Sequence, residues 1–277
     1  MAVATYLIDG VALDDPATRW RLERATRLPA TANRRVSQLG LPFRDGAIGI
    51  RQGMDVGQVG LSVAVLDRDM AGGLWDLAVM DDRRAAIAAM LAGAKTVTWQ
   101  PGTGRSRKAD VIESVVAEPE LVGRRGLILS AALTVQPFWS ESAPILSASR
   151  PLVAGPVTFP EFAGCTGKLA DAIIRISGPF TGLTLTAGAT GVSTTYLLVK
   201  GGSFYIDTAT FRAWSSASAT AWTGGTARAV DYPLGGPIQL WPTLAGDPLN
   251  MPVSLTVEGT GFTANSTIAI RSRRWFL

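Results

Sequence analysis

The chain has 277 residues, of which 47% are hydrophobic and 17% charged; this composition supplies a core for one large or two ordinary β-rich domains and excludes wholesale disorder. The net charge of +4 is small and spread over both halves, whereas a dedicated nucleic-acid binder concentrates positive charge on one element. The chain contains no histidine and one cysteine, Cys165, which removes histidine-based catalytic systems, disulfides within the chain and cysteine-rich metal sites. We therefore expect no catalytic residues, no metal site and no cofactor.

No apolar run reaches the length of about 18 residues that a membrane-spanning helix requires. Residues 1–10 lack the positive flank, apolar stretch and cleavage site of a signal peptide. We therefore expect a protein that is made in a cytoplasm and does not insert into a membrane.

The first half opens with a predicted strand at residues 6–8, closed by Asp9-Gly10, a dipeptide typical of two-residue hairpin turns. Trp20-Arg21-Leu22 alternates in the manner of an exposed edge strand. Residues 58–66 alternate over a longer span and predict a strand that places four apolar side chains on one face: Val59, Leu61, Val63 and Val65.

One helix is predicted, at residues 82–91, with Asp81 as its cap and Gly93 ending it in a left-handed turn. Its buried stripe is expected to hold Ile87, Met90 and Leu91, and its exposed side to begin with Arg83 and Arg84. Strands are then predicted at residues 96–99 and 111–116, antiparallel to each other, and at residues 126–135.

The second half is poor in charge and rich in Gly, Ser, Thr and β-branched residues. Strands are predicted at residues 172–176, 183–186, 195–199, 204–206, 238–241, 253–257 and 267–270. Short strands separated by turns about every ten residues are typical of an antiparallel sandwich. The change in texture predicts two domains, at residues 1–145 and 146–277.

The order of these segments resembles the distal tail protein family of siphophages over nearly the whole chain. The N-terminal Ile8-Asp9-Gly10-Val11, the Gly46-Ala47 turn and the single helix match the family pattern, as does Pro137-Phe138-Trp139 after a long strand. In the second half, the match lies in the Gly178-Pro179 turn, the segment from Tyr196 to Asp207-Thr208, Leu240-Trp241-Pro242 and the closing Arg271 to Trp275.

The resemblance implies a mainly β protein, with a β-sandwich-like N-terminal domain carrying one α-helix and a galectin-like antiparallel β-sandwich after it. The first domain would form a hexameric ring that joins the tail tube to the tail hub or baseplate and lets DNA pass through its channel. The implied partners are further copies of the chain, the tail-tube protein, the hub or tail-associated protein, and the tape-measure protein. The implied location is the distal end of the virion tail, after assembly in the bacterial host cytoplasm.

Three cations follow a Gly-rich stretch in residues 101–108: Arg105, Arg107 and Lys108. A phosphate-binding loop opens a helix, whereas this loop is expected to open a strand. One interpretation is a basic hairpin tip that contacts a neighbouring subunit or faces the channel; the other is a solvated hairpin tip.

A second basic stretch contains Arg19, Arg21 and Arg24. These arginines either pair with acidic neighbours across a subunit interface or form a solvated face. A third lies near the C-terminus, where Arg271, Arg273 and Arg274 flank Ile270 and Trp275. That segment predicts a final strand docked on one of the domains, and a return to the first domain is one of the options.

Two tryptophans beside the Ser/Ala-rich residues 215–227, Trp214 and Trp222, are candidates for stacking on a sugar ring. Trp241 is instead expected to be a core residue inside a strand. An alternative function is therefore a carbohydrate-binding module that attaches a phage tail to its host. A second alternative is a tail-tube subunit.

Overall fold

A computed structural model describes residues 5–15, 17, 19–23, 29–30, 32–40, 47–66, 77–101, 105–121, 126–187, 193–196, 202–229, 238–243 and 247–277. The chain forms two compact units, Met1–Trp139 together with Leu277, and Ser140–Phe276. Both are built mainly from antiparallel strands, as the sequence predicted. Within the described ranges, no helix combines the length and the apolar character needed to cross a membrane.

The first unit contains an antiparallel sheet with the strand order β2-β1-β7-β8-β10-β6-β3. Its predicted long strands are confirmed, and the four apolar side chains expected on one face of β6 are all buried. The bounds are β1 Thr5–Ile8, β2 Val11–Ala12, β3 Trp20–Leu22, β6 Gly57–Leu66, β7 Thr96–Gln100, β8 Arg107–Val116 and β10 Gly126–Val135, with β9 (Glu120–Leu121) paired to β10.

The predicted hairpin between β1 and β2 is confirmed. Asp9 and Gly10 have φ angles of 49° and 86°, and two consecutive positive φ angles define the turn whose twist matches that of paired strands. The Asp9 carboxylate also accepts hydrogen bonds from the backbone N–H groups of Lys95 and Thr96. The turn therefore fixes the first residues of β7 against β1.

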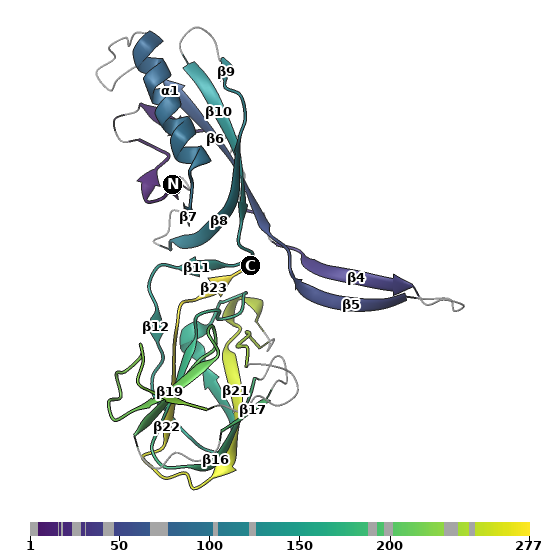
Figure 1. Cartoon of the computed structure of the whole chain (residues 1–277), viewed down its shortest axis with the longest axis vertical. Helices are drawn as coiled ribbons and strands as arrows, with labels where there is room; N and C mark the ends of the chain where they lie inside the picture. Colours follow the sequence, from purple (N-terminus) through teal and green to yellow (C-terminus); the bar gives the residue numbers. More distant parts are fainter. Residues whose placement is uncertain are drawn as a thin grey trace. The chain divides into compact units, whose positions relative to one another are not determined.

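The strands β4 (Arg34–Gly40) and β5 (Ala47–Met54) pair with each other in a separate two-stranded sheet (Figure 1). Among the described strands, neither joins the larger sheets. No strand was predicted over residues 34–54. Of the Gly46-Ala47 turn named there, Ala47 is the first residue of β5 and Gly46 falls outside the described residues.

Helix α1 (Leu77–Ala92) lies against β6, β8 and β10 (Figure 1). It begins before the predicted residue 82, so Asp81 is an internal helix residue and not the cap. The predicted end at Gly93 is confirmed, although Gly93 is absent from the residues with positive φ, so the expected left-handed turn is wrong. The buried stripe consists of Met80, Arg83, Ile87 and Leu91, whereas Met90, expected in it, is only partly buried.

The second unit contains two sheets. One has the order β12-β22-β15-β18-β19-β20, with β13 also paired to β22, and the other has the order β14-β21-β16-β17. The bounds are β12 Ile145–Leu146, β13 Arg150–Pro151, β14 Gly155–Phe159, β15 Ile173–Ser177, β16 Thr181–Ala187, β17 Ser193–Tyr196, β18 Ser203–Asp207, β19 Arg212–Ser216, β20 Thr226–Arg228, β21 Val253–Thr260 and β22 Thr267–Ser272. Two short 3₁₀ helices, Pro160–Phe162 and Pro248–Asn250, lie between them.

The core of the second unit contains side chains from both sheets, as a sandwich requires. In β15, Ile174 and Ile176 are fully buried, while the alternate residue Arg175 is not. In β16, Leu183 and Leu185 are buried in the same core, and Cys165 lies there as a small apolar residue. The period of two in the sequence thus places one face of each sheet in the core.

The predicted strand at residues 238–241 is wrong. Ile238 and Leu240 are buried in the core, but this segment contributes only an isolated bridge from Pro242 to Val253. Trp241, expected in the core, is only partly buried. Burial of alternate side chains without a paired backbone gives the same sequence pattern as a strand.

The C-terminal segment ends as β23 (Trp275–Phe276), paired with β11 (Trp139–Glu141). The Arg274 guanidinium lies 2.9 Å from a Glu141 carboxylate oxygen. Asp171 accepts hydrogen bonds from the Ser272 hydroxyl, the Arg273 backbone N–H and the Trp275 indole. These contacts attach the end of the chain to the second unit.

Candidate functional site

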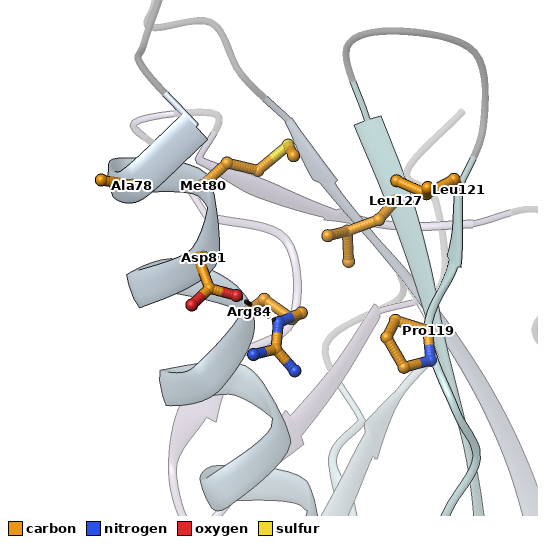
Figure 2. A pocket seen from close by; sticks show the side chains of 7 residues that line it. All are labelled: Ala78, Met80, Asp81, Arg84, Pro119, Leu121 and Leu127. Atoms are coloured by element: carbon orange, nitrogen blue, oxygen red, sulfur yellow. Dashed lines mark hydrogen bonds and ion pairs between the residues drawn. The ribbon is translucent and has the colours of Figure 1, made fainter.

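An apolar groove lies in the first unit between α1 and the strands β9 and β10 (Figure 2). Its volume is 610 Å³, and it is lined by Ala78, Met80, Asp81, Arg84, Pro119, Leu121 and Leu127. No feature of the sequence predicted this groove. The helix was predicted too short to include Ala78 and Met80, and residues 117–121 were assigned to no element.

The floor and the rim of the groove differ in character. Met80 and Leu127 are buried and point toward each other from the helix and from β10 (Figure 2). Leu121 is 75% exposed at the rim. On the helix side, Arg84 Nε donates to Asp81 Oδ1 over 2.7 Å. Because this carboxylate is already paired, the groove is suited to holding apolar side chains beside one ion pair.

Two of the three cations predicted in the basic loop at residues 101–108 lie in a strand, and residues 102–104 fall outside the described residues. Arg107 and Lys108 belong to β8, where Trp99 faces Arg107 and Thr98 faces Lys108 on the neighbouring strand β7. The Arg107 guanidinium lies over the Trp99 ring, 5.5 Å from its centroid. Of the three predicted cations, Arg105 and Lys108 are exposed. The placement of Arg107 and Lys108 at a hairpin tip is therefore wrong.

The second basic stretch is divided by the fold. Arg19 forms a two-pronged ion pair with Asp15, with Nε 2.6 Å from Oδ2 and the second amine group 3.0 Å from Oδ1. The hydrogen bond from Arg19 is the largest contribution to the pKa of the Asp15 carboxyl and lowers it below its usual value. Arg19 also lies 4.5 Å from the Trp20 ring centroid. The acidic partner of Arg19 is therefore Asp15 of the same chain and not a residue of a neighbouring subunit.

Arg21 lies in β3 at the end of the sheet order, and its side chain is exposed. The predicted edge strand at residues 20–22 is thus confirmed as an element, while a role for Arg21 in subunit contact stays a prediction. Arg24 falls outside the described residues.

Trp214 and Trp222 lie together on the face of the second unit's larger sheet that is turned away from the core. They are 7% and 8% exposed and pack on Tyr205. Trp214 stacks parallel to Tyr205 at 5.5 Å, and Trp222 meets it edge-on at 5.4 Å. The structure brings the predicted pair together but buries both rings. Trp214 stacks on Tyr205, and the Arg175 guanidinium lies over the Trp222 ring, 5.1 Å from its centroid, so neither ring is exposed for stacking on a sugar.

Clusters of acidic, histidine or cysteine side chains that could hold a metal ion are not found among the described residues. Asp207 forms a turn, in which its carboxylate accepts hydrogen bonds from the N–H groups of Ala209 and Thr210. Turn formation is the ordinary role of an aspartate at the end of a strand, here β18.

No protein-family model and no curated protein sequence matches the chain. Among solved structures, the chain is similar to the Dit protein of phage SPP1 at 15% identity, with a TM-score of 0.51 over 99% of this chain and 100% of that chain. A chain of the phage P2 baseplate in its activated conformation with Ca is 11% identical and covers 98% of this chain and 98% of its own length, at a TM-score of 0.32. A chain of the same baseplate with Sr is 12% identical and covers 97% of this chain and 98% of its own length, also at a TM-score of 0.32. That score is too low to compare folds. The likeness to SPP1 Dit extends over both units, and the chain therefore has a Dit-like fold.

Proposed function

We propose that the chain is a structural protein of a phage tail tip that acts by assembly and not by catalysis. Six copies form a closed ring through the first unit, which joins the tail tube to the tail hub and lets DNA pass through its channel. A closed ring uses head-to-tail contacts, so each copy presents two different surfaces to its neighbours.

The observation that carries this proposal is the match of fold over 99% of this chain and the whole of SPP1 Dit. SPP1 Dit is described as a paradigm of the hub adsorption apparatus in phages that infect Gram-positive bacteria. A match over both units is more specific than a match of one sandwich, because sandwiches host many unrelated functions.

The surface of the first unit also supports assembly. Ile112, Val115 and Leu121 are each more than half exposed, and Leu121 borders the apolar groove. Permanent interfaces bury about 2,000 Å² or more and are more apolar than ordinary surface. In the proposed ring, a neighbouring copy covers the groove.

The hairpin β4–β5 also supports assembly. Its two strands hydrogen-bond with each other and with none of the other described strands. A lone two-stranded hairpin is marginally stable in water, so contact with another copy would stabilise it.

Negative-stain imaging of the purified chain tests the proposal. We expect six-fold rings with a central hole. Particles of monomer size at high protein concentration would contradict it, and long stacked tubes would favour a tail-tube subunit instead.

A further inference from the structure

A second hollow, of 810 Å³, lies on the larger sheet of the second unit. One row of residues crosses four neighbouring strands beneath it: Arg271 in β22, Ile173 in β15, Asp207 in β18 and Arg212 in β19. Three spacings of about 4.8 Å between strands separate the two arginines, so their long side chains can reach one ligand from opposite sides.

The hollow is basic. Arg212, Arg228 and Arg271 line it, and Asp207 is its one acidic residue. Both oxygens of Asp207 accept hydrogen bonds within its own turn, from the Ala209 N–H at 2.8 Å and the Thr210 hydroxyl at 2.7 Å. Among the described residues, no carboxylate forms an ion pair with any of the three arginines. Guanidinium groups of this kind bind phosphate or carboxylate through paired hydrogen bonds.

An aromatic side chain stands at the same hollow. Phe211 is 50% exposed, and its φ angle is 60°, in the left-handed region that residues other than glycine rarely adopt. This φ angle belongs to the turn at residues 208–211 that joins β18 to β19. Here it presents a ring beside the exposed Arg212.

The remaining wall is rigid. Trp214 and Trp222 line the hollow while they pack on Tyr205. The Trp214 indole donates to the Ala221 carbonyl over 2.8 Å, and the Tyr205 hydroxyl donates to the Ser218 carbonyl over 2.8 Å. These hydrogen bonds hold the segment between β19 and β20 in place, so the site is formed before any ligand binds.

We propose that this hollow binds an anionic saccharide, a sugar that carries phosphate or carboxylate. The arginines hold the anionic group, and the Phe211 ring packs on the apolar face of the sugar. This binding activity goes beyond the structural role proposed above and does not depend on it, since every residue involved lies in the second unit.

Calorimetric titration with glucose 1-phosphate, glucose and inorganic phosphate tests the proposal. Glucose 1-phosphate is expected to bind at least tenfold more tightly than glucose and more tightly than phosphate. The double variant Arg212→Ala/Arg271→Ala should lose at least tenfold of the affinity, and Arg228→Ala a smaller part. Phe211→Asn keeps a residue that tolerates positive φ; it should weaken binding of glucose 1-phosphate and leave binding of phosphate unchanged.

Arg105→Ala is the matched control, because it removes an exposed arginine from the first unit; it should bind glucose 1-phosphate as the wild type does. Thermal melting verifies that each variant is folded. Equal affinity for glucose and glucose 1-phosphate, unchanged affinity in the folded arginine variants, or no binding of glucose 1-phosphate at millimolar concentration would each overturn the proposal.

Discussion

Trp99 and Arg107 face each other across β7 and β8, with the guanidinium 5.5 Å from the centre of the indole ring. The Arg107 guanidinium therefore has its aromatic partner, Trp99, within the same chain. Arg107 serves the fold of the first unit, and the exposed Arg105 and Lys108 remain as candidates for contact with other molecules.

Replacing Arg107 by alanine should destabilise the first unit by about 0.5–2 kcal/mol, the range measured for cation–π pairs. Urea unfolding, followed by tryptophan fluorescence, measures the change. Arg105→Ala is the matched control, because it removes an exposed cation two residues before Arg107 in the same unit. Its effect should stay within about 0.5 kcal/mol, and an equal loss in both variants would show that the ring contact contributes little.

Leu121→Asp should prevent or weaken ring formation, because it places a charge at the rim of the apolar groove that a neighbouring copy is proposed to cover. Size-exclusion chromatography with light scattering measures the assembly state. Leu249→Asp is the control: Leu249 is 80% exposed and belongs to the second unit. Rings that persist in Leu121→Asp at the wild-type level would exclude the groove from the interface.

Asp171→Ala should release the C-terminal segment. It removes the acceptor for the Ser272 hydroxyl, the Arg273 N–H and the Trp275 indole, and hydrogen bonds to a charged group contribute about 1.5–3 kcal/mol each. Limited trypsin digestion with mass spectrometry should then show faster cleavage after Arg273 and Arg274. Asp247→Ala, which loses the exposed hydrogen bonds to Leu249 and Asn250, should leave that cleavage rate unchanged.

Gly178→Ala should destabilise the second unit more than Gly155→Ala does. Both glycines have positive φ, so both variants carry a strain of about 1–3 kcal/mol. An added Cβ at Gly178 would also lie 2.6 Å from the Asn265 carbonyl oxygen, whereas nothing lies within 4 Å of one at Gly155. Thermal melting compares the two, and a lower melting temperature for Gly155→Ala would contradict the expected order.

The second unit should lose stability in acid through Glu161. Burial acts to raise the pKa of this carboxyl, but hydrogen bonds from the backbone N–H groups of Glu161 and Ala148, together with the charge of Arg150, bring the pKa below its usual 4.5. Because the folded pKa lies below the unfolded one, this stabilisation is present above pH 4.5 and lost as the pH falls through the folded pKa.

Melting temperatures of the wild type and of Glu161→Gln, measured from pH 7 down to pH 3, test this. The wild type should be more stable at pH 7, and the difference should shrink in acid. A difference that stays constant with pH would show that the charge of Glu161 has no part in it.

The long alternating strands were the elements that the sequence predicted best. In β6 and β10, every second residue is apolar and buried, so local pattern and tertiary burial agree. The Asp9-Gly10 turn could be predicted equally well, because few other dipeptides adopt two positive φ angles.

The failures arose where tertiary contacts override local pattern. Arg83, expected on the exposed side of the helix, is buried because its guanidinium donates to the Leu66 carbonyl at the end of β6 over 3.1 Å. That partner is 17 residues away and leaves no periodic signal. The site residues were found only in part for the same reason: Trp214 and Trp222 were identified as a pair, but Tyr205, which buries them, was not.

Labelling an intact phage particle that carries this chain, with an antibody against the second unit, tests the central claim most directly. Electron microscopy should show the label at the distal end of the tail. Label on the capsid or along the tail shaft would contradict a role at the tail tip.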